Sequence, residues 1–104
     1  MVKVEIKEAN GVGLRTDGGL WIGQPLNDVA WQVQAQTDHF PTKAELREVV
    51  EVMWEETPAK KLFAFIPAAS ADIIAVLKSI GFKQEGRMKN ACESGDLIIV
   101  GRLR

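Results

Sequence analysis

The chain contains one histidine and one cysteine, and these two side chains are the first candidates for chemistry. His39 lies between a predicted strand and a predicted helix, where α/β folds often place active-site residues, and an imidazole there can act as a general base. We favour the simpler interpretation, an exposed loop histidine. Cys92 lies in a predicted hairpin loop, with no histidine near it in the sequence and no helix start to activate it, so we expect a free surface thiol.

Neither residue indicates a metal or dinucleotide site. A zinc site needs three or four ligands, which one histidine and one cysteine cannot supply without several carboxylates, so we predict no metal. Gly11 and Gly13 resemble part of a nucleotide-binding loop. They precede a hairpin rather than a helix, however, and the dinucleotide fingerprint fails for that reason. We assign no catalytic residue.

The elements that hold these residues begin with strands. Val2 to Lys7 alternates apolar and charged residues, which predicts a half-buried strand. The turn residues Asp17-Gly18-Gly19 predict a hairpin that joins Val12 to Arg15 with Leu20 to Ile22. Val29 to Gln36 alternates apolar residues with glutamines, and this predicts a strand with one apolar face and one uncharged polar face.

Two helices and three further strands complete the pattern. The helix Thr42 to Glu56 begins with a capping box formed by Thr42 and Glu45, and it carries an apolar stripe at helical spacing. Lys61 to Ile66 has apolar residues on both faces, which predicts a central, parallel strand that is covered on both sides. The second helix begins at Ser70, whose side chain can cap it, and ends at Gly81. The last two strands are Phe82 to Arg87 and Leu97 to Leu103.

The predicted order is β-β-β-α-β-α-β-β, an α/β fold with a mixed (α+β) sheet and helices on both of its faces. A length of 104 residues and a hydrophobic content of 46% support one domain, residues 1–104. The net charge of −1 attracts neither nucleic acid nor an anionic membrane. The N-terminus lacks the apolar region of a signal peptide, and a single cysteine requires no oxidising compartment. We therefore expect a cytoplasmic protein.

The segment from Lys61 to Arg104 resembles the C-terminal half of the GCN5-related N-acetyltransferase (GNAT) fold. It has the order strand, helix, strand, strand, with Ile80-Gly81-Phe82 at the end of the helix and Glu85-Gly86-Arg87 soon after. In that family, a strand leads into a turn of pattern Arg/Gln-x-x-Gly-x-Gly/Ala, and the following helix N-terminus holds the pyrophosphate of acetyl-coenzyme A. The chain is short for the family, because the N-terminal helix pair that forms much of the acceptor pocket is missing.

The chain departs from the family pattern at two places. The turn Thr37-Asp38-His39-Phe40-Pro41 contains no glycine, Pro41 has no N–H to donate, and Asp38 would repel an anion. The capping box at Thr42 already uses donors that a phosphate would need. The family's Leu-Tyr pair aligns with Val76-Leu77, and the chain has no tyrosine to serve as a general acid for the departing thiolate.

We therefore favour a non-catalytic GNAT-like domain without a cofactor, which acts through protein contacts at its sheet edges or first helix. A short form that lacks the phosphate loop resembles proteins of tailed-bacteriophage head assembly. The resemblance implies viral structural proteins or a second copy as partners, in a host cytoplasm or a virion. From the net charge we expect no membrane partner and do not favour nucleic acid. The alternative is an acetyl-coenzyme A-dependent N-acetyltransferase with a divergent site. In this alternative, Gln34 and Gln36 would bind the pantetheine arm of the cofactor. Thr42, Lys43 and Ala44 would bind its phosphates, and a glutamine or His39 would transfer the proton.

Overall fold

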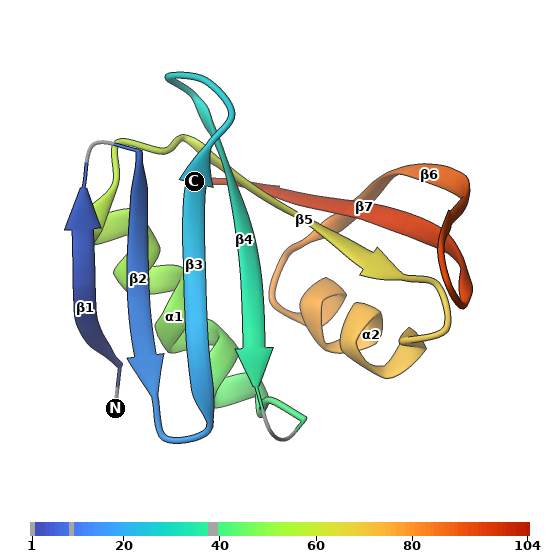
Figure 1. Cartoon of the computed structure of the whole chain (residues 1–104), viewed down its shortest axis with the longest axis horizontal. Helices are drawn as coiled ribbons and strands as arrows, with labels where there is room; N and C mark the ends of the chain where they lie inside the picture. The colour runs from blue at the N-terminus through green and yellow to red at the C-terminus, as the bar shows by residue number, and fades with distance from the viewer. Residues whose placement is uncertain (1, 9, 38–39) are drawn as a thin grey trace.

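The computed structural model describes residues 2–8, 10–37 and 40–104. Within these ranges the chain forms one seven-stranded mixed sheet, in the order β1-β2-β3-β4-β5-β7-β6, with two helices (Figure 1). The elements are β1 (Lys3–Glu8), β2 (Gly11–Thr16), β3 (Gly19–Pro25), β4 (Ala30–Thr37), α1 (Lys43–Glu56), β5 (Lys61–Pro67), α2 (Ala71–Ser79), β6 (Lys83–Cys92) and β7 (Gly95–Leu103). The mixed sheet with two helices confirms the predicted fold class. Four strands rather than three precede α1, because both arms of the predicted hairpin extend into full strands.

The sheet is continuous, but its two halves are joined by a short ladder. Strands β1 to β4 are antiparallel neighbours. Strand β4 then pairs in parallel with β5 through three residue pairs, which end at Gln32 and Phe63. Beyond that point β4 stays with β3 as far as Thr37, while β5 stays with β7 as far as Pro67. The two strands therefore diverge, as Figure 1 shows.

Helix α1 begins as the sequence predicts. The Oγ1 atom of Thr42 accepts a hydrogen bond of 3.1 Å from the backbone N–H of Glu45, which confirms the threonine half of the capping box. At the other end, the hydroxyl of Thr57 donates to the carbonyl oxygen of Met53 over 2.7 Å. Within the described ranges, neither helix is long and apolar enough to cross a membrane.

Helix α2 ends as predicted but begins differently. Its N-cap is Ser70, yet the serine side chain makes no cap hydrogen bond, so the predicted side-chain cap is wrong. At the C-terminus, Gly81 has a φ of +101°. The backbone N–H of Phe82 donates to the carbonyl of Leu77 over 3.0 Å, and that of Gly81 donates to Lys78 over 3.1 Å. This pair of bonds is a Schellman motif, which glycine permits at no steric cost.

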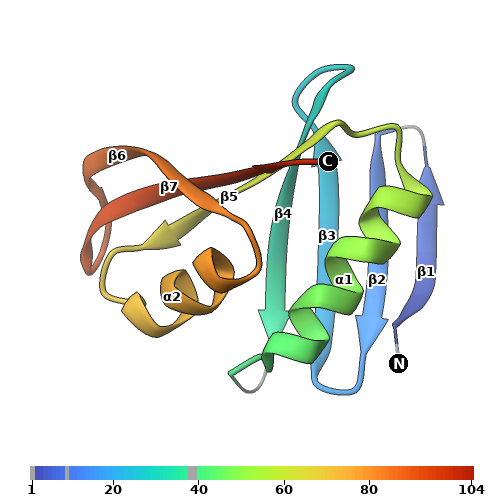
Figure 2. The same ribbon diagram turned by 180° about the vertical axis from the view of Figure 1, so that it is seen from behind.

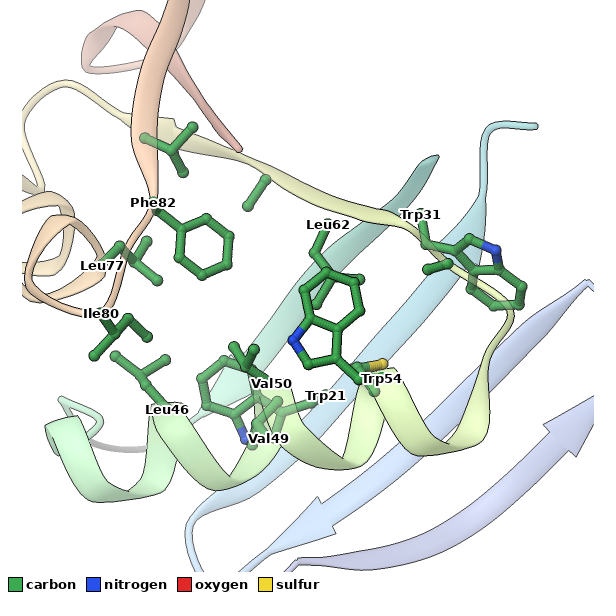
Figure 3. Close-up of a cluster of buried hydrophobic side chains, with 14 of the residues drawn as sticks. Trp21, Trp31, Leu46, Val49, Val50, Trp54, Leu62, Leu77, Ile80 and Phe82 are labelled. Carbon is green, nitrogen blue, oxygen red and sulfur yellow. The ribbon is translucent and has the colours of Figure 1, made fainter. Parts of the chain in front are cut away.

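Both helices lie on the same face of the sheet, which corrects the prediction of one helix on each face. Buried residues of α1 and of the end of α2 belong to one cluster, together with strand residues of a single parity (Figure 3). The reason is topological. The β4–α1–β5 and β5–α2–β6 crossovers run in the same direction across the sheet, and right-handed crossovers in one direction place their helices on one side. We call this side the helix face.

The opposite side, which we call the open face, carries neither helix. In Figure 1 strands β1 to β4 face the viewer uncovered, and in Figure 2 α1 crosses them on the other side. The open face displays Leu20 and Ile22, which are half-buried, and Phe65, which is 37% exposed. The central position of β5 and its parallel pairing with β4 are as predicted. The expected cover on both sides of β5 holds for Leu62 and Phe63, which point to opposite faces and are both buried, and it ends at Phe65.

Candidate functional site

A cavity of about 460 Å³ lies where β4 and β5 diverge. This volume is in the range of about 300–1,000 Å³ that is typical of small-molecule sites. We call this cavity the cleft. Both strands, both helices and the chain just before α1 contribute to its lining, through residues that include Val33, Gln34, Ala35, Thr37, Pro41, Leu46, Ala64, Phe65, Ile66, Ser70 and Ile73.

The cleft is bordered by two strand edges. From Val33 to Thr37, β4 pairs with β3 on one side, and no described residue forms a ladder with it on the β5 side. From Ala64 to Pro67, β5 pairs with β7 and has no ladder partner toward β4. Such edges present backbone N–H and C=O groups that are strong hydrogen-bonding partners. An extended ligand with amide groups suits this border.

The walls of the cleft are mainly apolar. Trp21, Met53 and Leu62 line its helix-face side, and all three belong to the buried core. The indole N–H of Trp21 donates to the hydroxyl of Thr16 over 3.3 Å, which fixes the ring against the cleft. Among the residues that the structure describes, the polar side chains of the lining are those of Gln32, Gln34, Thr37 and Ser70, besides the Trp21 indole. These residues can bind a ligand through apolar contact and neutral hydrogen bonds.

The structure brings only one of the five predicted cofactor-binding residues, Gln34, into the lining of the cleft. Gln36 lies two residues further along β4 and lines a separate shallow cavity beside the turn between β2 and β3. Thr42 and Ala44 line a third cavity, next to Val2, and Lys43 is exposed at the first position of α1. Two further residues on which the sequence argument depended, Asp38 and His39, lie outside the described residues.

The surroundings of Thr42 and Ala44 are acidic. Their cavity is also lined by Asp17, Glu45 and Glu48, and a carboxylate oxygen of Glu48 accepts a 2.9 Å hydrogen bond from the backbone of Val2. Carboxylates repel a diphosphate that approaches from this side. The predicted phosphate contacts at Thr42 and Ala44 are therefore electrostatically unfavourable from that direction.

Two hydroxyl groups in the cleft, those of Thr37 and Ser70, were missed by the sequence argument. Each lies at one end of a regular element: Thr37 is the last residue of β4, and Ser70 is the N-cap of α2. An indication was present in the sequence, because element ends next to a crossover commonly face ligands in α/β folds. Cys92 is free, as predicted, but it is half-buried at the end of β6 rather than exposed in a loop, and it does not line the cleft.

Comparison with known proteins gives a consistent result for the fold. No protein-family model matches the chain, and no curated protein matches it. Among solved structures, a ribosomal-protein-alanine N-acetyltransferase from Brucella melitensis superposes with a TM-score of 0.74 at 18% identity, over 90% of this chain and 69% of that one. A GNAT-family acetyltransferase from Elizabethkingia anophelis, with acetyl-CoA bound, gives 0.73 at 14% identity over 91% and 77%. An IAA acetyltransferase from Bacillus cereus gives 0.77 at 12% identity over 100% and 99%.

Identities this low establish the fold alone. They agree with the resemblance found in the C-terminal half of the sequence, and they contain no indication of phage head assembly. The strand order, the two crossover helices and these superpositions give the chain the fold of the GNAT acetyltransferases.

Proposed function

We propose that the chain binds an acyl-coenzyme A in the cleft between β4 and β5 and transfers the acyl group to an amine. The observation that carries this proposal is the divergence of the two strands after Gln32 and Phe63, which creates a ligand-sized cavity in the middle of a sheet. A structural relative with the same fold has acetyl-CoA bound.

The pantetheine arm matches the border of the cleft. The arm is an extended chain with two amides, and the edge of β4 from Val33 to Thr37 offers backbone donors and acceptors at strand spacing. The apolar walls accept the methylene groups and the thioester. This contact resembles the addition of a strand to a sheet edge, in which main-chain hydrogen bonds supply affinity.

The phosphate end is expected to contribute less than the arm. The hydroxyl of Thr42 occupies the N–H of Glu45, and Asp17 and Glu48 lie beside the start of α1. Among the described residues, Lys43 supplies a positive charge at that start, at an exposed position. We therefore expect acetyl-pantetheine to bind only about tenfold more weakly than acetyl-coenzyme A, since one screened charge contributes on the order of 1 kcal/mol.

The reaction needs little from the lining side chains. An uncharged amine nitrogen attacks the thioester carbonyl carbon, the C–N bond forms, and the C–S bond breaks. The proton lost by the amine passes through water to the departing thiolate. The hydroxyls of Thr37 and Ser70 and the amide of Gln34 can donate hydrogen bonds to the carbonyl oxygen as it gains charge.

Calorimetry with acetyl-coenzyme A tests the binding step. Ala35 lines the cleft and is exposed, so Ala35→Trp should fill the cleft and weaken binding at least tenfold. Ala91→Trp places the same ring on an exposed position of β6 outside the cleft and should leave affinity unchanged. Absence of binding to the wild-type chain at millimolar ligand, or equal affinity in both variants, would refute the proposal.

The non-catalytic role remains the second candidate. One observation favours it: the described residues that line the cleft include no carboxylate, lysine, arginine, cysteine or tyrosine. Such a cleft suits binding without turnover, in which acyl-coenzyme A or another amide-containing chain is held and not consumed. Release of free coenzyme A thiol in the presence of amine acceptors distinguishes the two. A role in phage head assembly has no support from the comparisons and remains an untested prediction.

A further inference from the structure

We propose that two copies of the chain associate through the open faces of their strands β1 to β4, around a two-fold axis that runs across the strands. The contact goes beyond the proposed acyl transfer and does not depend on it. A symmetric dimer of this kind needs a surface that is complementary to itself. The apolar residues, the glutamines and the charges of this face all meet that condition.

The open face of β1 to β4 has no helix over it, as Figure 1 shows. Ile6 is 52% exposed there, and Leu20 and Ile22 on β3 are half-buried. The exposed residues of β3 and β4 on this side are the glutamines Gln24, Gln34 and Gln36. A primary amide both donates and accepts hydrogen bonds, so glutamines of two copies can pair without charge repulsion.

The strand register defines a central row across this face. Ile6 lies opposite Gly13, which lies opposite Ile22 on β3. Ile22 in turn lies opposite Gln34 on β4. Directly opposite residues of an antiparallel pair share one side of the sheet, so all four belong to the open face. A two-fold axis along this row places each residue over its own counterpart, so that isoleucine contacts isoleucine and amide contacts amide.

Two charges of β1 lie symmetrically about the central row. Lys3 lies opposite Arg15, two residues from Gly13 in one direction. Glu8 lies opposite Gly11, two residues from Gly13 in the other direction. Both charged side chains are exposed, and within the described residues neither forms an ion pair. The two-fold axis therefore places Lys3 of each copy over Glu8 of the other, which makes two intermolecular ion pairs.

Other contacts between two copies fit this register less well. An extra residue interrupts the β1–β2 ladder between Val4 and Ile6, and a bulged, charged edge resists the addition of another strand. A two-fold axis parallel to the strands would lay β1 over β4 of the second copy. Lys3 and Glu8 would then contact glutamines and lose water without gaining an ionic partner, which is costly. The crossing axis avoids both problems.

A hollow beside the central row gives the two copies room to interlock. Its volume is about 230 Å³, and its lining includes Gln24 and Gly13, which has no side chain. Leu20 and Gln24 lie on opposite sides of the row on β3, so the axis places Leu20 of one copy over Gln24 of the other. The leucine can then enter the hollow. Glu8 also lines the hollow, and Lys3 of the second copy neutralises it.

The size of the face sets the expected strength of the contact. Four strands about 4.8 Å apart and roughly 24 Å long cover about 450 Å² per copy. A standard protein interface buries about 800 Å² per partner, so this contact belongs to the weak and transient class. We therefore expect a Kd on the order of 100 µM.

Sedimentation equilibrium tests the association, with the chain at concentrations from about 10 µM to about 1 mM, tenfold on either side of the expected Kd. We expect a reversible dimer whose Kd rises with salt, because salt screens the ion pairs at its rim. Gln34 belongs to the central row and also lines the cleft, so the measurement is made without acyl-coenzyme A. Its result is then independent of the proposed function. A monomer at every concentration refutes the dimer.

Charge reversal tests the direction of the axis. Glu8→Lys and Lys3→Glu each place like charges together at two symmetric points, and each should raise the Kd about tenfold. The double variant restores both ion pairs at an unchanged net charge and should return the Kd to within about threefold of the wild-type value. Lys83→Glu reverses an exposed charge on β6 outside the contact and should change the Kd less than about twofold. Single variants that match Lys83→Glu, or a double variant that does not recover, refute the proposed arrangement.

A pair of leucines tests the apolar part of the contact. Leu20→Ala shortens the side chain that enters the hollow and should raise the Kd about tenfold. Leu103→Ala removes the same group from the end of β7, where the leucine is 71% exposed and lies outside the contact, and should leave the Kd unchanged. Circular dichroism checks that both variants are folded. Equal Kd values in the two variants would refute the assignment of Leu20 to the hollow.

Discussion

The helix face and the open face are built from the same strands but have different properties. On the helix face, Leu14, Leu62 and Val100 are completely buried. On the open face, Leu20 is half-buried and Phe65 is 37% exposed. Because alternate residues of one strand point to opposite sides, a single sequence supplies both surfaces. The difference indicates that the helix face supports the fold, whereas the open face is available for contacts outside the chain.

The largest expected effect is a difference between two leucines on neighbouring strands. Leu14→Ala leaves a cavity beneath α1 and should lower the free energy of unfolding by about 3 kcal/mol. Leu20→Ala on the open face should cost about 1 kcal/mol or less, since its side chain keeps solvent contact in the folded state. Urea titration of both variants measures the difference. Equal losses would mean that the open face contributes to the core after all.

A pair of glycines sharpens the same comparison. A Cβ at Gly23 would lie 2.8 Å from the sulfur of Met53, which is fully buried, so Gly23→Ala should cost about 1–3 kcal/mol through overpacking. A Cβ at Gly13 would lie 3.5 Å from the nearest atom of Ile6, which is an ordinary contact, so Gly13→Ala should change stability by no more than about 0.5 kcal/mol. Thermal unfolding distinguishes them. A large loss at Gly13 would contradict the assignment of spare room on the open face.

Substitutions at the N-caps of the two helices test how each helix start contributes to stability. Thr42→Ala removes the hydrogen bond to the N–H of Glu45 and should cost about 1 kcal/mol. Ser70→Ala removes a hydroxyl that makes no cap bond and should leave stability nearly unchanged. Chemical denaturation of the two variants gives the comparison. A loss at Ser70 as large as that at Thr42 would mean that its hydroxyl has a structural role in solution.

The smallest effect is a dependence on pH at the far end of the sheet. The backbone N–H of Asn90, at 2.9 Å, and the guanidinium of Arg87, at 2.5 Å, lower the pKa of Asp96 below its ordinary value of 3.8. Its ionised form therefore stabilises the fold above that value, and this contribution is lost as the pH falls through the lowered pKa. Asp96→Asn should flatten the acid side of the stability profile. Urea titration at each pH between 5 and 2 measures the free energy of unfolding across the ordinary carboxyl pKa of about 4. An unchanged slope of this free energy against pH would show that the pair is fully solvated.

Local patterns in the sequence were sufficient for the elements but not for their arrangement. The capped start at Thr42 and the stop at Gly81 depend on neighbouring residues, and both are present in the structure. The side on which α2 packs depends on the direction of a crossover, which no local period encodes. Likewise, the length of the ladder between β4 and β5 is decided by tertiary packing. The cleft therefore did not follow from the sequence, and of the five predicted cofactor-binding residues Gln34 alone lines it.

The short ladder between β4 and β5 has a mechanical consequence. Its three residue pairs form the strand ladder that joins the first four strands to the last three within the described residues, and backbone hydrogen bonds from Lys60 and Lys61 to Val29 lie beside it. A slight rotation of these two parts of the sheet about the ladder would widen the opening of the cleft. A ligand that contacts both parts would resist that rotation. Its binding should therefore slow amide hydrogen exchange in strands that the ligand does not contact.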